Sequence, residues 1–295
     1  MTTAVPFELV VATSVGDVVE ALAGERPARV LAGGQSLVPL LVTRAVRPSV
    51  LVDVNEVGLD GVAVDRAAGL LRLGATVRHR TVERHPTIRR WAPLLAAAAA
   101  WVGHPPIRHR GTLGGSLAHA DPAAELPAAV VALDGSVTVR GVAGARILAA
   151  ADLAAGPFAT VLAPDELLAE VAVPLAGQRA GAAFCEWAPR HRDRAEAGVG
   201  VAVEADARGA CTGARGATCG VTPRPVDLTD VLDDALRGVT VGGPLPDPLV
   251  RHVAGAVTGV CREHGAGTDS AALAGAMAAR AAVRAMGRTP EADVP

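Results

Sequence analysis

Residues 107–127 read IRHRGTLGGSLAHADPAAELP, and this stretch decides how the rest of the chain is interpreted. Its glycine-rich part, residues 110–117, is called the second glycine loop below; it carries hydroxyl groups at Thr112 and Ser116 and is followed closely by Asp121. Glycine allows close approach of the backbone to a ligand. Hydroxyl groups can donate to phosphate, and a carboxylate accepts hydrogen bonds from sugar hydroxyls. The stretch therefore combines phosphate donors with an acceptor for hydroxyls.

A related turn lies upstream, between an apolar run at 28–32 and the apolar stretch LVPLLV. We call it the first glycine loop. Its residues are Leu31, Ala32, Gly33, Gly34, Gln35, Ser36 and Leu37. Adjacent glycines between a strand and a helix can form a nest of N–H groups that suits a diphosphate, although such a turn alone is more often only a turn. The loop lacks the spacing of a Rossmann fingerprint and of a P-loop, so both folds are disfavoured. Because the chain has two such loops, the explanation that both are only structural turns is less attractive.

The first 55 residues or so predict a small parallel sheet. Residues 14–24 are predicted to form a helix capped by Ser14, with Asp17 in its first turn and Gly24 at its end. Strands are expected at 28–32 and 50–54, with a short helix at LVPLLV between them. This β-α-β alternation is typical of parallel strands.

The remainder predicts a second α+β layer and a third module. Strands are expected at 70–75, 136–140, 168–173, 198–205 and 216–221, the last two antiparallel. An Ala-rich helix is expected over 87–102, burying Trp91, Leu94, Leu95 and Trp101, and further helices over 248–286. Pro174 and Gly177 mark a boundary. The predicted domains are residues 1–177, with subdomains of about 1–57 and 58–177, then 178–288, and a frayed tail at 289–295.

Composition excludes several function classes. The net charge of −2 and the pI of 6.4 give no attraction to nucleic acid, although every basic residue is Arg. The longest apolar run, 94–102, is too short to span a bilayer, and the N-terminus lacks a secretory pattern, so we expect a cytoplasmic protein.

Cysteine and histidine spacing predicts no metal site on this chain. The four cysteines form no Cys-x-x-Cys pair and are expected to be free thiols; whether Cys211 and Cys219 are neighbours stays open. Five histidines cluster in the sequence but lack His-Glu-x-x-His spacing, so we assign them no metal-binding or acid–base role. They are His79, His85, His104, His109 and His119. No residue is identified as catalytic.

Two segments carry a family resemblance. LAGGQSLVPL at 31–40 and the stretch at 107–127 resemble the two signature segments of the FAD-binding medium subunit shared by carbon monoxide dehydrogenases, bacterial xanthine dehydrogenases and related molybdenum hydroxylases. Weaker similarity runs through VDVNEV, GATVRHRTVERHPTI, APDELLAEVAVP and GVTPRPVDLTD. The resemblance therefore covers nearly the whole chain.

The resemblance implies an α+β fold of the PCMH/VAO-like type, in which two subdomains hold an extended FAD. A small C-terminal α+β domain with a three-stranded antiparallel sheet and helices follows. Both glycine loops would hold the diphosphate, Asp121 the polyol or ribose, and Leu168 would lie against the flavin ring. The implied FAD-binding residues are Leu31, Ala32, Gly33, Gly34, Gln35, Ser36, Leu37, Thr112, Gly114, Gly115, Ser116, Asp121 and Leu168.

The same resemblance implies a role in electron transfer. FAD would take electrons from [2Fe-2S] clusters on an iron–sulfur subunit, after a large subunit with a molybdenum cofactor has oxidised the substrate. The electrons would then pass to NAD, a quinone or oxygen. Two alternatives stay open: a free-standing FAD-dependent oxidase or dehydrogenase that acts directly on a small molecule, and a scaffold without flavin.

One position departs from the family pattern. Many relatives have Arg-x-x-Asp-Tyr/Phe-Ala near the flavin, whereas the segment PRHRDRA at 189–195 has Arg194 at the aromatic position. A cation there can alter the flavin potential or the access of an acceptor. We therefore do not assign to this chain the shielding of the flavin ring or the docking of NAD that the family's aromatic residue would imply.

Overall fold

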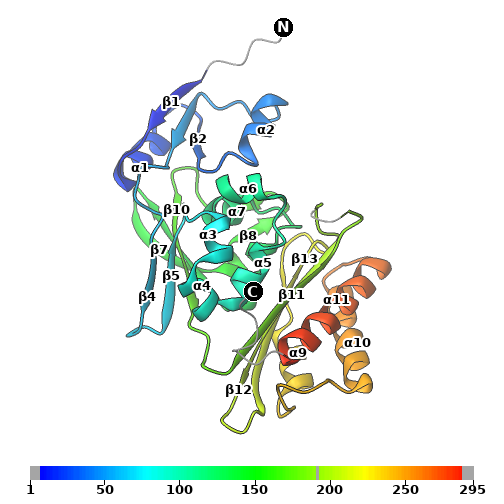
Figure 1. Cartoon of the computed structure of the whole chain (residues 1–295). Coiled ribbons are helices and arrows are strands. Elements are labelled where there is room, and N and C mark those ends of the chain that lie inside the picture. Colours follow the sequence, from blue (N-terminus) through cyan, green and yellow to red (C-terminus); the bar gives the residue numbers. More distant parts are fainter. Residues whose placement is uncertain (1–6, 191–192, 288–295) are drawn as a thin grey trace.

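The computed structural model describes residues 7–190 and 193–287. Figure 1 shows a small N-terminal sheet beside a larger antiparallel sheet, a group of short helices, and a further sheet backed by longer helices. We refer to residues 7–177, which carry the first two sheets and the short helices, as the first unit. We refer to residues 178–287, which carry the last sheet and its helices, as the C-terminal unit. The predicted tail at 289–295 lies outside the described residues.

The small sheet is parallel, as the sequence predicted. Its strand order is β1-β3-β2, with β1 (Glu8–Val11), β3 (Val50–Asp53) and β2 (Ala28–Leu31). Helix α1 (Val15–Ala23) begins at a capping box, in which Ser14 accepts from the Asp17 N–H and the Asp17 carboxylate binds the Ser14 N–H. The turn after β2 leads into α2 (Leu37–Val42). Strand β1 was not predicted.

The central strand of the larger sheet, β10, comes from a later part of the chain than its neighbours β5 and β6. Its order is β4 (Val62–Asp65), β5 (Leu70–Gly74), β10 (Leu167–Pro174), β6 (Ser136–Gly141) and β7 (Gly144–Ala149). All neighbours in it are antiparallel. Buried and half-buried residues alternate along β5, which is the pattern of a sheet with one face on a core. A short hairpin, β8 (Ala154–Gly156) and β9 (Ala159–Thr160), leaves this sheet after β7.

Short helices fill the space beside this sheet. They are α3 (His79–Arg84), α4 (Pro86–Trp91), α5 (Pro93–Ala99), α6 (Pro105–Arg110), α7 (Leu113–His119) and α8 (Glu125–Ala132). The single helix predicted over 87–102 is wrong, because Pro93 cannot continue a helix and forces Ala92 out of helical geometry (φ −142°, ψ 61°). Leu94 and Leu95 are fully buried, but Trp91 and Trp101 stay half-buried.

The C-terminal unit has a four-stranded antiparallel sheet rather than the expected three strands. Its order is β11 (Ala180–Trp187), β12 (Ala197–Ala205), β13 (Cys211–Cys219) and β14 (Val226–Asp227). The strand predicted at 216–221 begins earlier and ends at Cys219, since Gly220 turns the chain with φ +86°. Helices α9 (Thr229–Leu236), α10 (Asp247–Glu263) and α11 (Thr268–Gly287) follow.

The two faces of the C-terminal sheet join different cores. Phe184, Ala217 and Cys219 pack into the core of the first unit, whereas the other face packs against α9 to α11. All four cysteines are buried free thiols. Cys211 and Cys219 lie at opposite ends of β13 and in different cores, so they are not neighbours.

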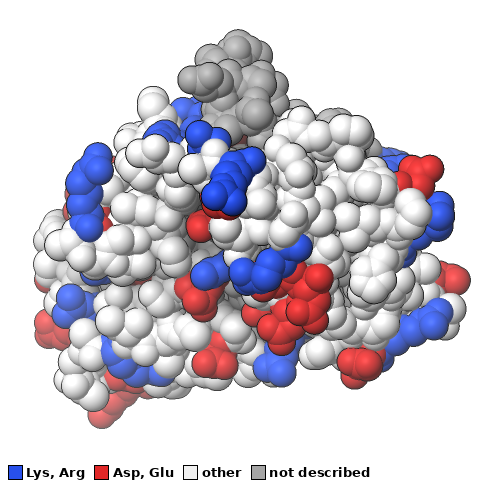
Figure 2. Space-filling model, turned by 90° about the horizontal axis from the view of Figure 1, so that it is seen from below, with Lys and Arg blue, Asp and Glu red and all other residues white. Residues whose placement is uncertain are grey.

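The described surface carries mixed charge, and Figure 2 shows acidic and basic side chains interspersed over one face among uncharged ones. None of the helices within residues 7–190 and 193–287 is long and apolar enough to cross a membrane.

Candidate functional site

The two glycine loops lie in direct contact. A Cβ added at Gly33 would lie 2.2 Å from the Arg110 carbonyl oxygen and 2.8 Å from the Gly111 Cα. Only glycine at position 33 permits the backbones to approach this closely. The structure therefore brings together the two segments that the sequence singled out, although they are far apart along the chain.

The first glycine loop offers unused backbone donors. Within the described part of the chain, the N–H groups of Gly33, Gly34, Gln35 and Ser36 have no hydrogen-bond acceptor. The loop is held by its carbonyls instead: Gly33 accepts from Gln35 Nε2 (3.1 Å) and Gly34 accepts from the Val38 N–H (3.0 Å). Gly34 has φ +73°, in the left-handed region that favours glycine. A run of free N–H groups in such a turn suits an anion.

The second glycine loop differs, because its amides are already used within the protein. Leu113 N–H donates to Val77 O (2.9 Å), Gly114 to Ala75 O (2.8 Å), Gly115 to Thr112 Oγ1 (3.1 Å) and Ser116 to Thr112 O (3.0 Å). A Cβ at Gly114 would lie 2.5 Å from the Ala75 Cβ, so this glycine is required for packing. Gly115 is exposed and the Ser116 side chain is half-buried. The loop therefore contributes close approach and a hydroxyl group rather than free amides.

A polar network that the sequence did not single out ties the loops together. Asn55 Nδ2 donates to the Ala32 carbonyl (3.1 Å), and Arg78 Nη2 donates to Asn55 Oδ1 (2.6 Å). The other amino group of Arg78, Nη1, donates to the carbonyl of Arg110 (2.5 Å). Asn55 and Arg78 lie in the segments VDVNEV and GATVRHR, and Asn55 is the only Asn in the chain. Their place in these two segments, and the fact that the chain has a single Asn, are the sequence signals that could have identified Asn55 and Arg78 as site residues.

The loops lie next to positive charge. Burial, and then the neighbouring Arg110, lowers the pKa of Arg78 below its ordinary value. A guanidinium remains charged at neutral pH even so. The positive charges of Arg78 and Arg110 favour a negatively charged group near the loops, whereas Asp53 and Asp60 act on Arg78 in the opposite sense.

His79 supports the second glycine loop. Its ring is buried, and burial lowers its pKa to about 4, so the imidazole is neutral at pH 7. Since a carbonyl can only accept, Nε2 carries the proton and donates to the Thr112 carbonyl (2.8 Å). A Cβ at Gly111 would lie 2.8 Å from the same ring. Among the residues that the structure describes, no three His, Cys, Asp or Glu side chains are grouped to hold a metal ion.

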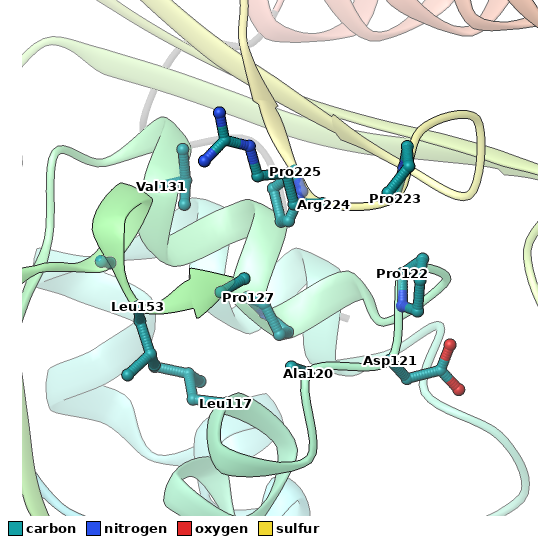
Figure 3. Close-up of a pocket in the computed structure, with 12 residues that line it drawn as sticks. Leu117, Ala120, Asp121, Pro122, Pro127, Val131, Leu153, Pro223, Arg224 and Pro225 are labelled. Atoms are coloured by element: carbon teal, nitrogen blue, oxygen red, sulfur yellow. The ribbon is translucent and has the colours of Figure 1, made fainter. Parts of the chain in front are cut away.

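Asp121 lies beyond the end of α7, where the two units meet. Its Oδ1 accepts from the Ala123 N–H (3.0 Å) and from Arg194 Nη2 (2.6 Å) of the C-terminal unit. Figure 3 shows Asp121 at the edge of a small cavity between α7, α8 and residues 223–225, with its carboxylate directed away from the apolar lining. The cavity volume of about 20 Å³ suits about one water molecule, so it is too small for a cofactor.

Leu168 lies in the core behind the second loop. It is only 4% exposed and belongs to the hydrophobic cluster of the first unit. The next residue, Ala169, accepts the Ala75 N–H (2.9 Å), and Ala75 in turn accepts the Gly114 N–H. Strand β10 therefore anchors the second glycine loop through one intervening residue.

Two buried carboxyl groups, which the sequence did not reveal, lie behind Asp121. Glu125 opens α8, and Glu186 pairs across the sheet with Gly198, which pairs in turn with Cys219. Burial raises the pKa of Glu125 to about 7, and burial together with Glu125 raises the pKa of Glu186 to about 8. Glu186 Oε2 has no hydrogen-bond partner within the described residues. Both carboxyl groups therefore hold their protons to a higher pH than an exposed glutamate does.

This burial predicts a pH-dependent stability. The Glu186 carboxyl loses its proton near 4.5 in the unfolded chain but near 8 in the folded one, so the free energy of unfolding falls as pH rises through this window. Glu186→Gln cannot ionise, and we expect it to raise the free energy of unfolding by about 1–2 kcal/mol at pH 8 and to change it little at pH 4.5. Urea unfolding of the apoprotein at both pH values measures this difference.

Glu204→Gln is the matched control, because Glu204 is exposed on the adjacent strand β12. It should leave the pH profile unchanged. An equal gain at pH 4.5 and pH 8 for Glu186→Gln would contradict the assignment, since the effect would not depend on ionisation.

Comparison with known proteins adds three findings. A family model described as the FAD binding domain in molybdopterin dehydrogenase matches residues 5–176. The 6-hydroxypseudooxynicotine dehydrogenase complex subunit alpha of Paenarthrobacter nicotinovorans is 45% identical over 211 residues, which cover 71% of each chain. The caffeine dehydrogenase subunit beta of Pseudomonas sp. (strain CBB1) is 36% identical over 267 residues, covering 90% of this chain and 89% of the relative.

The likeness extends to solved structures. A chain of the carbon monoxide dehydrogenase of Hydrogenophaga pseudoflava superposes with a TM-score of 0.87 at 29% identity. The superposition covers 98% of this chain and 100% of that one. The similarity therefore includes the C-terminal unit, which lies outside the segment that the family model matches.

Proposed function

Since the chain belongs to the family of FAD-binding domains of molybdopterin dehydrogenases, we propose that its two glycine loops hold the diphosphate of FAD at their junction. The chain is an FAD-binding subunit of a molybdenum-hydroxylase-type dehydrogenase, with the α+β flavoprotein fold that the sequence predicted. The observation that carries the proposal is the contact of Gly33 with Arg110, which joins the loops beside free amides and two arginines.

The residues present fit the diphosphate. The N–H groups of Gly33, Gly34, Gln35 and Ser36 can donate to it, and the neighbouring positive charges of Arg78 and Arg110 can offset its charge. Glycine at 33 keeps the junction free of a side chain, because a Cβ there would meet the backbone of Arg110. The proposed FAD-binding residues remain Leu31, Ala32, Gly33, Gly34, Gln35, Ser36, Leu37, Thr112, Gly114, Gly115, Ser116, Asp121 and Leu168.

Bound FAD supplies the redox chemistry, because it exchanges electrons one or two at a time. The chain's own residues bind and orient it. His79 holds the second loop, and Asp121 offers Oδ2 to a sugar or ribityl hydroxyl. In this proposal no side chain needs to act as a general acid or base.

The proposed partners are an iron–sulfur subunit with [2Fe-2S] clusters and a large subunit with the molybdenum cofactor. Relatives are named as subunits of complexes for 6-hydroxypseudooxynicotine and caffeine. Such different substrates, on chains that share this fold, support a role for this chain that does not depend on the substrate. We propose NAD or another external acceptor for the electrons and the cytoplasm as the location, in keeping with four buried free thiols.

The test is the absorption spectrum of the purified chain, with the released chromophore identified by mass spectrometry. We expect FAD at close to one per chain. A colourless protein that fails to take up added FAD would overturn the proposed site. Co-purification separates the subunit from the free-standing oxidase: an iron–sulfur chain and a larger molybdenum-containing chain should accompany a subunit, whereas substrate-dependent reduction of FAD in the isolated chain would support the alternative.

A further inference from the structure

Four side chains from three separate segments meet where the two units touch. They are His119 at the end of α7, Asp121 just beyond it, Phe158 in the β8–β9 turn, and Arg194 between β11 and β12. Arg194 Nη2 lies 2.6 Å from Asp121 Oδ1, and the Arg194 Cζ lies 5.8 Å from the centroid of the Phe158 ring. The His119 ring tilts against Phe158 at 5.2 Å. Arg194 is therefore held from two sides by the first unit.

The backbone beneath Arg194 is strained. Phe158 has φ +57° and Ala120 has φ +49°, and the Phe158 N–H donates to the Ala120 carbonyl (2.8 Å). Residues other than glycine rarely adopt this region, and such strain persists where the surroundings impose it, often at functional sites. Phe158 is 54% exposed, so burial of its ring does not explain the strain. The turn instead holds an aromatic face against the Arg194 guanidinium.

Within the described residues, only one oxygen of the Asp121 carboxylate accepts hydrogen bonds. Oδ1 accepts from both Arg194 and the Ala123 N–H, whereas Oδ2 has no donor within the described residues. The two bonds fix the plane of the carboxylate and leave Oδ2 open. The Arg194 backbone N–H donates to Asp193 Oδ1 (2.9 Å), which fixes the start of the side chain.

We propose that Arg194 is a positioning residue of the FAD site: it holds the Asp121 carboxylate so that Oδ2 faces a hydroxyl group of FAD. The inference rests on the proposed function, in which Asp121 contacts the polyol or ribose. Because Arg194 belongs to the C-terminal unit, that unit takes part in flavin binding through Asp121. In this proposal Arg194 orients the Asp121 carboxylate of the first unit.

The experiment measures the dissociation constant of FAD for the apoprotein of the full chain, by flavin fluorescence, in a double-mutant cycle. We expect Asp121→Asn and Arg194→Gln each to weaken FAD binding by about tenfold, because each removes or misorients a charged hydrogen-bond partner. The double variant should bind FAD about as weakly as Asp121→Asn alone, since Arg194 acts through Asp121. Arg194→Lys should recover part of the affinity.

Arg215→Gln is the matched control. Arg215 also reaches across the units, to Asp134 at 3.6 Å, but lies outside this cluster. It should leave FAD affinity within about twofold of wild type. The Tm of the apoprotein should be alike in Arg194→Gln and Arg215→Gln, because both side chains are exposed.

The outcomes are distinguishable. Unchanged or tighter FAD binding in Arg194→Gln, with a loss in Asp121→Asn, overturns the positioning role alone. Full affinity in Asp121→Asn overturns the contact between Asp121 and FAD on which the inference rests. Equal losses in Arg194→Gln and Arg215→Gln, with lowered Tm in both, would show a general effect of unit docking and also overturn the inference.

Discussion

Gly33→Ala is expected to remove FAD from the protein. The new Cβ would lie 2.2 Å from the Arg110 carbonyl oxygen, and that oxygen belongs to the backbone and also accepts from Arg78. The two glycine loops would have to separate, which displaces the free amides of the first loop from the charge beside the second. We expect FAD affinity to fall by at least about 100-fold. The ratio of flavin to protein absorbance after gel filtration measures the loss.

Gly61→Ala is the control for this substitution. Gly61 lies in the same unit, has nothing within 4 Å of an added Cβ and does not adopt a positive φ. It should retain FAD fully. Normal FAD content in Gly33→Ala would show that the contact of the loops is not needed for binding, and the proposed site would then be wrong.

Arg108→Met is expected to produce the largest loss of stability. Arg108 is 3% exposed; its Nε donates to Glu83 Oε2 (3.0 Å), and its Nη1 donates to the carbonyls of Val102 (3.1 Å) and Gly103 (2.7 Å). Its removal would leave Glu83 with only the longer contacts to Arg80 (3.4 Å) and Arg84 (3.8 Å) and would take the donor from two carbonyls, so we expect a cost of about 2–4 kcal/mol. Urea unfolding of the apoprotein measures the free energy, with the slope checked for two-state behaviour.

Arg84→Met provides the matched comparison, because Arg84 pairs with the same Glu83 at 3.8 Å but is 63% exposed. Exposed pairs of this kind contribute about 0–1 kcal/mol. A loss for Arg108→Met as small as that for Arg84→Met would mean that Arg108 does not hold the segment before the second glycine loop.

Local signals in the sequence predicted much of the first unit. Ser14 and Asp17 form the predicted capping box, and the Gly33-Gly34 turn separates β2 from α2 as expected. These features depend on neighbouring residues, which a sequence displays directly. The helix over 87–102 was mispredicted because its apolar periodicity continues across Pro93, and the proline governs the backbone there.

Other features could not be read from the chain. Strand β11 is buried along nearly its whole length because both of its faces pack against cores, so it lacks the alternation that reveals a strand with one exposed face. The contact of Gly33 with Arg110, the pairing of Arg194 with Asp121 and the approach of Glu125 to Glu186 join distant segments. Each depends on tertiary packing between segments far apart in the chain, which residue spacing does not encode.

The central place of β10 has a consequence for biosynthesis. A ribosome delivers both glycine loops well before Leu167–Pro174, yet β5 and β6 meet only through that strand. Until it emerges, the nascent chain has two open strand edges, and Ala75, which holds Gly114, lacks its partner Ala169. If the glycine loops hold FAD as proposed, we therefore expect flavin loading to follow completion of the sheet. A chain released before this point would carry both signature segments and still be prone to aggregate rather than to take up cofactor.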